Sequence, residues 1–306
     1  MCNVTVGASF LVLLIVFPCI VVGQSDNVES DPSVVRRMLG PGYPIDRVRV
    51  DARQYPWSAV GRITLFDSVL RPGGLTSCTG TLVGENLVLT AAHCVWSRRH
   101  YPEEVFFLAG FQQDSFVAHS SAKHIHIHEA FEGGEPSPRT FSVDWALIEL
   151  NRPIGKEAGY VGVAAFDAQV FGSMDKERAR FKVSGYRGDR LLVQTVDHDC
   201  QIDGFTGDDK LILHRCPITK GDSGGPLFLP VQGELLVVGT DVGLLGVEID
   251  VDGKQRNVGF GVAVPASGFR DKLKELGIDM GAMKGRSGLV GHLGRDPRTS
   301  KGSLDE

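Results

Sequence analysis

The sequence predicts an all-β protein built from many short strands and tight turns. Three observations favour this fold class: 38 glycines among 306 residues, short apolar runs in place of long amphipathic ones, and Gly/Pro-rich stretches that separate those runs. The composition, 42% hydrophobic and 23% charged, is that of a globular protein long enough for one large or two small cores. A net charge of −5 gives no reason to expect nucleic acid as a partner.

The N-terminus has the pattern of a signal peptide over residues 1–23. Residues 10–22 are almost wholly apolar but too few to span a bilayer comfortably, and small residues at Val21 and Gly23 suit cleavage after Gly23. An uncleaved membrane anchor is the alternative. Residues 24–45 are mostly polar and end in a Gly/Pro cluster, as in a flexible leader or propeptide. We therefore expect an exported protein, secreted or periplasmic, with no stable membrane association once the signal is removed.

The cysteines favour two disulfides. Removal of residues 1–23 leaves four of the six cysteines, an even number that suits an exported chain, and four cysteines allow three pairings. We favour the two local pairings, Cys78–Cys94 and Cys200–Cys216, each worth about 2–4 kcal/mol.

A glycine-rich turn, Gly221-Asp222-Ser223-Gly224-Gly225-Pro226, is the strongest chemical signal. Its composition suits a turn that presents one hydroxyl. A serine hydroxyl needs a base and a group that orients the base. Upstream stretches supply His93 in Thr-Ala-Ala-His-Cys and Asp144 ahead of a second apolar run.

These three stretches, in the order His, Asp, Ser, resemble the chymotrypsin-like (trypsin-fold) serine proteases from about residue 56 to residue 276. Gly-Tyr-Arg-Gly-Asp at 185–189 resembles the bacterial glutamyl-endopeptidase branch more than trypsin itself. The resemblance implies two six-stranded antiparallel barrels, a short C-terminal helix and a protease domain over 46–280 with the barrel boundary near 152–180. It also matches the Cys78–Cys94 bridge to the family's bridge beside its histidine.

The implied chemistry is hydrolysis of protein or peptide substrates without metal or cofactor. His93, Asp144 and Ser223 are the expected catalytic residues, and the N–H groups of Gly221 and Ser223 the expected oxyanion hole. The α/β-hydrolase alternative needs a histidine after the serine, and only His292 follows it. A protease-fold binding protein with a closed pocket remains the second functional reading.

The sequence decides neither the substrate preference nor the route of activation. Pro217, Lys220, Asp241 and Gly243 occupy the expected pocket positions. Asp241 would favour a basic substrate side chain, whereas Lys220 would favour an acidic one. In activated relatives a newly cut N-terminus pairs with the aspartate that precedes the serine. Here cleavage after Arg47 or Arg49 would release a valine terminus, or the enzyme needs no such cut.

The remaining elements follow in order. The resemblance implies a first barrel strand at 56–63. The residue pattern predicts a hairpin over 77–95 that turns at 84–86, and a second hairpin from 226–229 and 235–239. A further strand is expected at 257–265, a helix at 267–276 capped by Ser267 and Gly277, and a disordered tail at 281–306. His124, His126 and His128 would share one face of a strand. A zinc site is the alternative interpretation of this pattern, and a solvent-facing strand is the favoured one.

Overall fold

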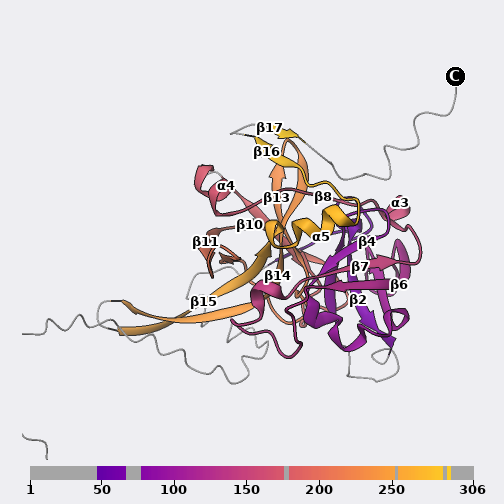
Figure 1. The fold of residues 1–306 in the computed structure, drawn as a ribbon, viewed down its shortest axis with the longest axis horizontal. Coiled ribbons are helices and arrows are strands. Elements are labelled where there is room, and N and C mark those ends of the chain that lie inside the picture. Colours follow the sequence, from indigo (N-terminus) through magenta and orange to yellow (C-terminus); the bar gives the residue numbers. More distant parts are fainter. Residues whose placement is uncertain (1–46, 67–76, 176–178, 252–253, 285–287, 291–306) are drawn as a thin grey trace, which may run out of the picture.

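The fold is seen in a computed structural model that describes residues 47–66, 77–175, 179–251, 254–284 and 288–290. The expected signal peptide (1–23) and leader (24–45) lie outside the described residues. Strands dominate the ribbon and helices are short (Figure 1). Within the described ranges no helix is both long and apolar enough to cross a membrane.

Six strands of the first half close a barrel, as predicted. They pair antiparallel in the order β2-β3-β4-β7-β6-β5. Their bounds are β2 (Val60–Leu65), β3 (Cys78–Leu82), β4 (Leu87–Thr90), β5 (Val105–Ala109), β6 (Ala118–Ile127) and β7 (Ala146–Leu150). The predicted hairpin is β3–β4, with Thr81 opposite Leu89. All residues of β2, β3 and β4 are buried, and apart from Arg62 they are apolar or small.

The first predicted strand begins later than the sequence indicated. Residues 57–59 form a 3₁₀ turn, η1 (Trp57–Ala59), and the strand starts at Val60. Pro56 already has helical backbone angles, and the N–H of Ser58 donates to the carbonyl of Gln54. These contacts form a turn where the family resemblance implied extended chain.

Among the described residues the second half forms a nine-stranded sheet, which is more strands than expected, and its closure into the predicted second barrel stays a prediction. Eight strands follow the order β1-β10-β9-β13-β14-β15-β12-β11, and β8 pairs parallel with β14. The bounds are β1 (Val48–Arg49), β8 (Gly162–Val163), β9 (Phe181–Gly185), β10 (Thr195–Cys200), β11 (Ile202–Thr206), β12 (Leu211–His214), β13 (Pro226–Val231), β14 (Glu234–Val251) and β15 (Lys254–Pro265). Two-residue strands such as β1 and β8 carry too little alternation to be predicted.

Strands β14 and β15 are much longer than predicted. The two strands pair from Gly239 opposite Pro265 to Val251 opposite Lys254. The register shifts once, at a bulge between Asp241 and Gly243. The outer part projects from the body as a two-stranded ribbon (Figure 1). The sequence of this part alternates apolar and acidic residues over 247–251 and leads into Asp252-Gly253, a pattern typical of a hairpin that the predicted strands did not include.

Short helices connect the strands. They are η2 (Ala92–Cys94), η3 (Trp96–Arg98), η4 (Pro102–Glu104), η5 (Phe141–Val143), α3 (Gly155–Ala158), α4 (Ala168–Ser173), η6 (Ala266–Phe269) and α5 (Arg270–Glu275). The predicted C-terminal helix therefore begins as a 3₁₀ turn and becomes α-helical at Arg270. Ser267 lies inside that turn, whose N-cap is Pro265, and Gly277 ends the helix with φ +80° as expected.

The expectation of disorder from residue 281 is corrected at the start of that segment. Strand β16 (Ala282–Lys284) pairs antiparallel with β17 (Gly288–Val290). Gly281 fastens this pair to the body, because its N–H donates to the carbonyl of Val163 and its own carbonyl accepts from the N–H of Ala165. Residues 291–306 lie outside the described residues.

Candidate active site

The pairing of β4 with β7 brings His93 and Asp144 to the same end of the barrel. These strands are antiparallel, with Thr90 opposite Ala146. His93 lies three residues after the end of β4, in η2, and Asp144 lies two residues before the start of β7. Although His93 and Asp144 are 51 positions apart in the sequence, the pairing of β4 with β7 brings them together.

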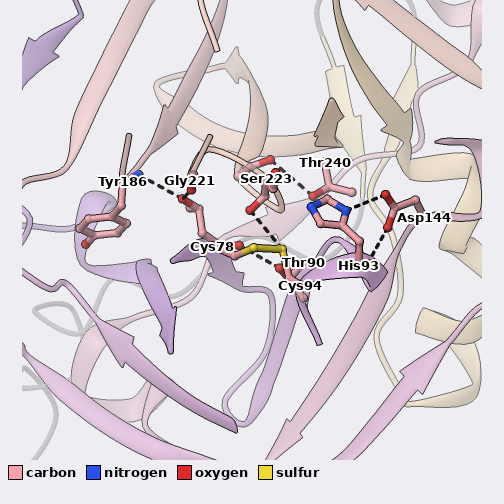
Figure 2. The surroundings of a disulfide bond; sticks show 11 residues. Cys78, Thr90, His93, Cys94, Asp144, Tyr186, Gly221, Ser223 and Thr240 are labelled. Atoms are coloured by element: carbon pink, nitrogen blue, oxygen red, sulfur yellow. Dashed lines mark hydrogen bonds and ion pairs between the residues drawn. A yellow bond between two sulfur atoms is a disulfide. The ribbon is translucent and has the colours of Figure 1, made fainter. Parts of the chain in front are cut away.

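Asp144 holds His93 through both of its carboxylate oxygens. Oδ2 lies 2.7 Å from Nδ1 of the imidazole, and Oδ1 accepts the backbone N–H of His93 at 2.8 Å. The Asp144 side chain is fully buried, and that of His93 is 14% exposed. An ionised carboxylate only accepts, so the proton of the neutral ring is assigned to Nδ1, which leaves Nε2 with a free lone pair. Figure 2 shows one ring nitrogen directed at Asp144 and the other on the side of Ser223 in that view.

The start of β3 joins the histidine segment to the serine turn. Cys78 forms a disulfide with Cys94, next to His93. The neighbouring Thr79 donates its N–H to the carbonyl of Ser223 at 2.9 Å. The sulfur of Cys94 itself lies 3.7 Å from that carbonyl oxygen (Figure 2). Ser223 is thus anchored against the residues that carry His93, although the two come from different halves of the chain.

The backbone of the serine turn requires glycine at residue 221. Gly221 has φ +96°, and a Cβ there would meet the carbonyl oxygen of Tyr186. The carbonyl of Gly221 accepts from Thr79 Oγ1 at 2.8 Å, and Thr79 Oγ1 accepts the N–H of Tyr186 at 3.0 Å. Within the part of the chain that the structure describes, the N–H groups of Gly221 and Ser223 donate to no protein acceptor.

Ser223 and His93 are near neighbours without a direct bond between their reactive atoms. In the described ranges, neither Ser223 Oγ nor His93 Nε2 has a hydrogen-bond partner. A long or open contact between nucleophile and base is common in an empty protease site and tightens with substrate. The histidine–aspartate contact is formed, and the serine–histidine contact is not.

The four expected pocket residues have very different surroundings. The backbone of Asp241 pairs with the serine turn, accepting from the N–H of Gly224 and donating to the carbonyl of Gly225. Lys220 is exposed and Pro217 is buried. Gly243 faces Phe141, whose ring a Cβ at 243 would meet.

Two buried partners in this region escaped the sequence analysis. The Asp241 carboxylate, 1% exposed, contacts Nε2 of fully buried His214 at 2.9 Å, and the other ring nitrogen of His214 accepts the N–H of Cys216 at 3.3 Å. The Asp222 carboxylate contacts the guanidinium of Arg47 at 2.7 Å, with both side chains 1% exposed. Burial raises the pKa of Asp222, and the positive charge of Arg47 opposes that rise. His214 and Arg47 stand in no recognisable motif, so only the folded chain reveals them.

Both predicted disulfides are confirmed. Cys78–Cys94 has its Cα atoms 6.0 Å apart, and Cys200–Cys216 has them 5.0 Å apart. Each bridge closes a loop with a sequence separation of 16. The first bridge lies beside His93. The second lies beside the His214–Asp241 pair, because the N–H of Cys216 donates to His214.

The three alternating histidines have separate surroundings. His126 Nε2 lies 2.7 Å from Glu149 on the neighbouring strand. His128 accepts the N–H of Ala130 and packs edge-on against Trp145, while His124 is exposed. Among the described residues, the groups of potential metal ligands are Cys78-His93-Cys94 and Cys200-His214-Cys216, and in both the cysteines are disulfide-bonded.

Comparison with known proteins agrees with this architecture. The family model for Trypsin matches residues 46–273. Serine protease 23 of Bos taurus is 29% identical over 173 residues, which cover 50% of this chain and 44% of that protein. Glutamyl endopeptidase of Bacillus licheniformis is 25% identical over 201 residues, or 64% of this chain and 56% of that one. The chain thus spans about half the length of these relatives.

A solved structure shares the fold. The chain resembles the "Structure of Glu endopeptidase in complex with MPD" with a TM-score of 0.54 and 19% identity, over 78% of this chain and 98% of that chain. At that identity the likeness concerns the fold alone. The family match covers most of the chain, over the residues that hold the histidine, the aspartate and the serine turn. The chain belongs to the Trypsin family.

Proposed function

We propose that this protein is an exported serine endopeptidase that uses His93, Asp144 and Ser223 as its catalytic residues. The observation that carries the proposal is the buried Asp144 carboxylate. It accepts the backbone N–H of His93 and contacts Nδ1 of the imidazole, which holds the ring beside the serine turn. The family supports a protease acting on peptide bonds. The two disulfides are typical of an oxidising compartment, which supports export.

In the proposed reaction, Ser223 Oγ attacks the peptide carbonyl carbon and its proton passes to His93 Nε2. The C–N bond then breaks, and the same proton passes to the departing amine. Water repeats the sequence on the acyl-enzyme, releasing the acid and restoring Ser223. Asp144 holds the imidazole and stabilises its positive charge in both halves of the reaction. These are the roles of the histidine, aspartate and serine in the family that the chain belongs to.

The N–H groups of Gly221 and Ser223 are the proposed donors to the oxyanion. Neither has a protein acceptor among the described residues, so both are available to a substrate oxygen. The loss of one such donor typically costs about 3 kcal/mol of transition-state stabilisation. Side chains and backbone suffice for this mechanism, which needs no cofactor.

The test is the variant Ser223→Ala, assayed for hydrolysis of unfolded casein. We expect kcat to fall by several decades, on the order of 10⁶ by the subtilisin precedent. Labelling with a fluorophosphonate, which reacts with an activated serine, should be lost at the same time. Ser120→Ala is a matched control, because Ser120 is buried in β6 of the first barrel and should leave both readouts near wild type. A wild-type hydrolysis rate in Ser223→Ala would refute the assignment.

A protease-fold binding protein with little activity is the second candidate. The observation in its favour is that the Asp241 carboxylate, at an expected pocket position, is buried and already paired with His214. Fluorophosphonate labelling of Ser223 without cleavage of any peptide in a broad library would favour this candidate. Labelling together with cleavage favours the endopeptidase, and the library would also report the residue preference.

A further inference from the structure

Arg47 reaches from the edge of the second sheet into the interior beneath the serine turn. It precedes β1, the edge strand that pairs with β10. Its Nη2 donates to the carbonyl of Thr195 at 3.0 Å, and its Nη1 lies 2.7 Å from Asp222 Oδ1 and 3.5 Å from the carbonyl of Pro217. Only 3% of this residue is exposed. The guanidinium is therefore held in place by strand β10 and by the segment that leads into the turn.

Asp222 is the residue through which this contact acts on the turn. Its Oδ2 accepts the N–H of Thr219 at 2.9 Å, and its backbone N–H donates to the carbonyl of Thr219 at 3.0 Å. Its carbonyl accepts the N–H of Gly225 at 2.7 Å. The side chain and backbone of Asp222 thus bind Thr219 and Gly225, on either side of Ser223.

A buried carboxylate needs a partner charge, and Arg47 is the cation in contact with it. Of the other charged groups near Asp222, Arg187 is engaged with Asp189 at 3.0 Å and Asp241 is itself an anion. Removal of one partner of a buried pair leaves an uncompensated charge, which the structure relieves by moving or by taking up a proton. Either response would alter the backbone that carries Gly221 and Ser223.

We propose that Arg47 is a positioning residue that holds the Ser223 turn through Asp222 in the uncleaved chain. The proposal rests on the proposed function of that turn, and it answers a question that the sequence left open. A cut after Arg47 would separate the guanidinium from β1, and a cut after Arg49 would detach β1 as well. Both bonds are therefore expected to stay intact in the active protein, and no new N-terminus is needed to assemble the site.

The first test measures hydrogen–deuterium exchange and needs no activity. Arg47→Met keeps the length of the side chain and removes its charge, Arg47→Lys keeps the charge, and Arg49→Met is the matched control on the exposed face of β1. We expect Arg47→Met to speed exchange in residues 219–225 at least tenfold while β4 and β7 stay unchanged. Arg47→Lys should give a smaller effect, and Arg49→Met none. Equal exchange of the turn in wild type, Arg47→Met and Arg47→Lys would overturn the proposal.

The second test asks which form of the full chain has a working site. Protein whose intact mass shows the 47–48 and 49–50 bonds uncut is labelled with a fluorophosphonate. We expect labelling of the uncut chain, and at least tenfold slower labelling of Arg47→Met with partial recovery in Arg47→Lys. Labelling confined to chains cut after Arg47 or Arg49 would overturn the proposal. Failure of both cut and uncut wild type to label would count against the protease function, while the exchange result would still decide the role of Arg47.

Discussion

Three buried carboxylates surround the serine turn, and each has a different partner. Asp144 faces His93, Asp222 faces Arg47, and Asp241 faces His214. A buried anion is tolerated only with such a partner. The chemical consequences differ, because a guanidinium keeps its charge at all working pH values, whereas an imidazole can give up its proton. The imidazole that is partly exposed, His93, is the one suited to proton transfer.

The pH dependence of stability shows whether burial or Arg47 dominates at Asp222. Burial raises the pKa of Asp222 above its usual value of 3.8. The folded protein then binds a proton more tightly than the unfolded chain, so stability falls as pH rises from below 3.8 through the raised pKa. Asp222→Asn lacks this dependence. We therefore expect the unfolding free energy of wild type, minus that of Asp222→Asn, to decrease as pH rises. Urea unfolding from pH 3 upwards measures this difference. If this difference instead increased with pH, the positive charge of Arg47 would outweigh the effect of burial on the pKa of Asp222.

At the residue scale, the sequence offered site candidates where a motif surrounds the residue. His93, Asp144 and Ser223 each lie in a short stretch with its own signature, and the structure joins the first two directly. Arg47 and His214 are ordinary residues in their local sequence. Their roles arise from partners 175 and 27 positions away, Asp222 and Asp241, that only the folded sheet brings into contact. Pocket residues were hard to interpret for the same reason, since the partner of Asp241 could not be foreseen.

At the scale of elements, β3 is the strand on which the site is assembled. Its first residues carry the disulfide to Cys94 and the hydrogen bond to Ser223. The hairpin β3–β4 was predictable, because buried apolar runs flank a tight turn. The length of β14 and β15 was missed, although apolar and acidic residues alternate over 247–251 and lead into Asp252-Gly253, a typical hairpin signal.

The two disulfides offer a matched pair for separating stability from site assembly. Both close loops of the same sequence separation, so the chain-entropy model assigns each about 3 kcal/mol. We expect the double variants Cys78→Ala/Cys94→Ala and Cys200→Ala/Cys216→Ala to lose similar unfolding free energy in urea titrations. The first should also lower kcat at least tenfold, because that bridge tethers the segment that carries His93. Equal kcat in the two double variants, at a temperature where both are folded, would contradict this role.

At the scale of the whole molecule, the site lies across two separately built halves. The closed barrel supplies His93 and Asp144, and the nine-stranded sheet supplies Ser223. Their relative position therefore depends on contacts that cross between them. Tyr186 makes one of these. It follows β9 of the second sheet, is fully buried in a core cluster that holds residues of both halves, and donates its hydroxyl to the carbonyl of Phe111 at 2.9 Å. Burial accordingly raises the pKa of its phenol.

Tyr186→Phe tests how much this contact between the halves contributes. The ring would remain packed beside Phe111, but the buried carbonyl of Phe111 would lose its donor. An unsatisfied buried acceptor costs about 1–3 kcal/mol. We expect a loss of unfolding free energy of that size in urea titrations, and a lower kcat because the serine turn would be held less firmly against the barrel. Tyr101→Phe is the control, since Tyr101 is 58% exposed and its removal should change stability by less than about 0.5 kcal/mol. If both variants were equally stable, the hydrogen bond between Tyr186 and Phe111 would contribute nothing to the joining of the two halves.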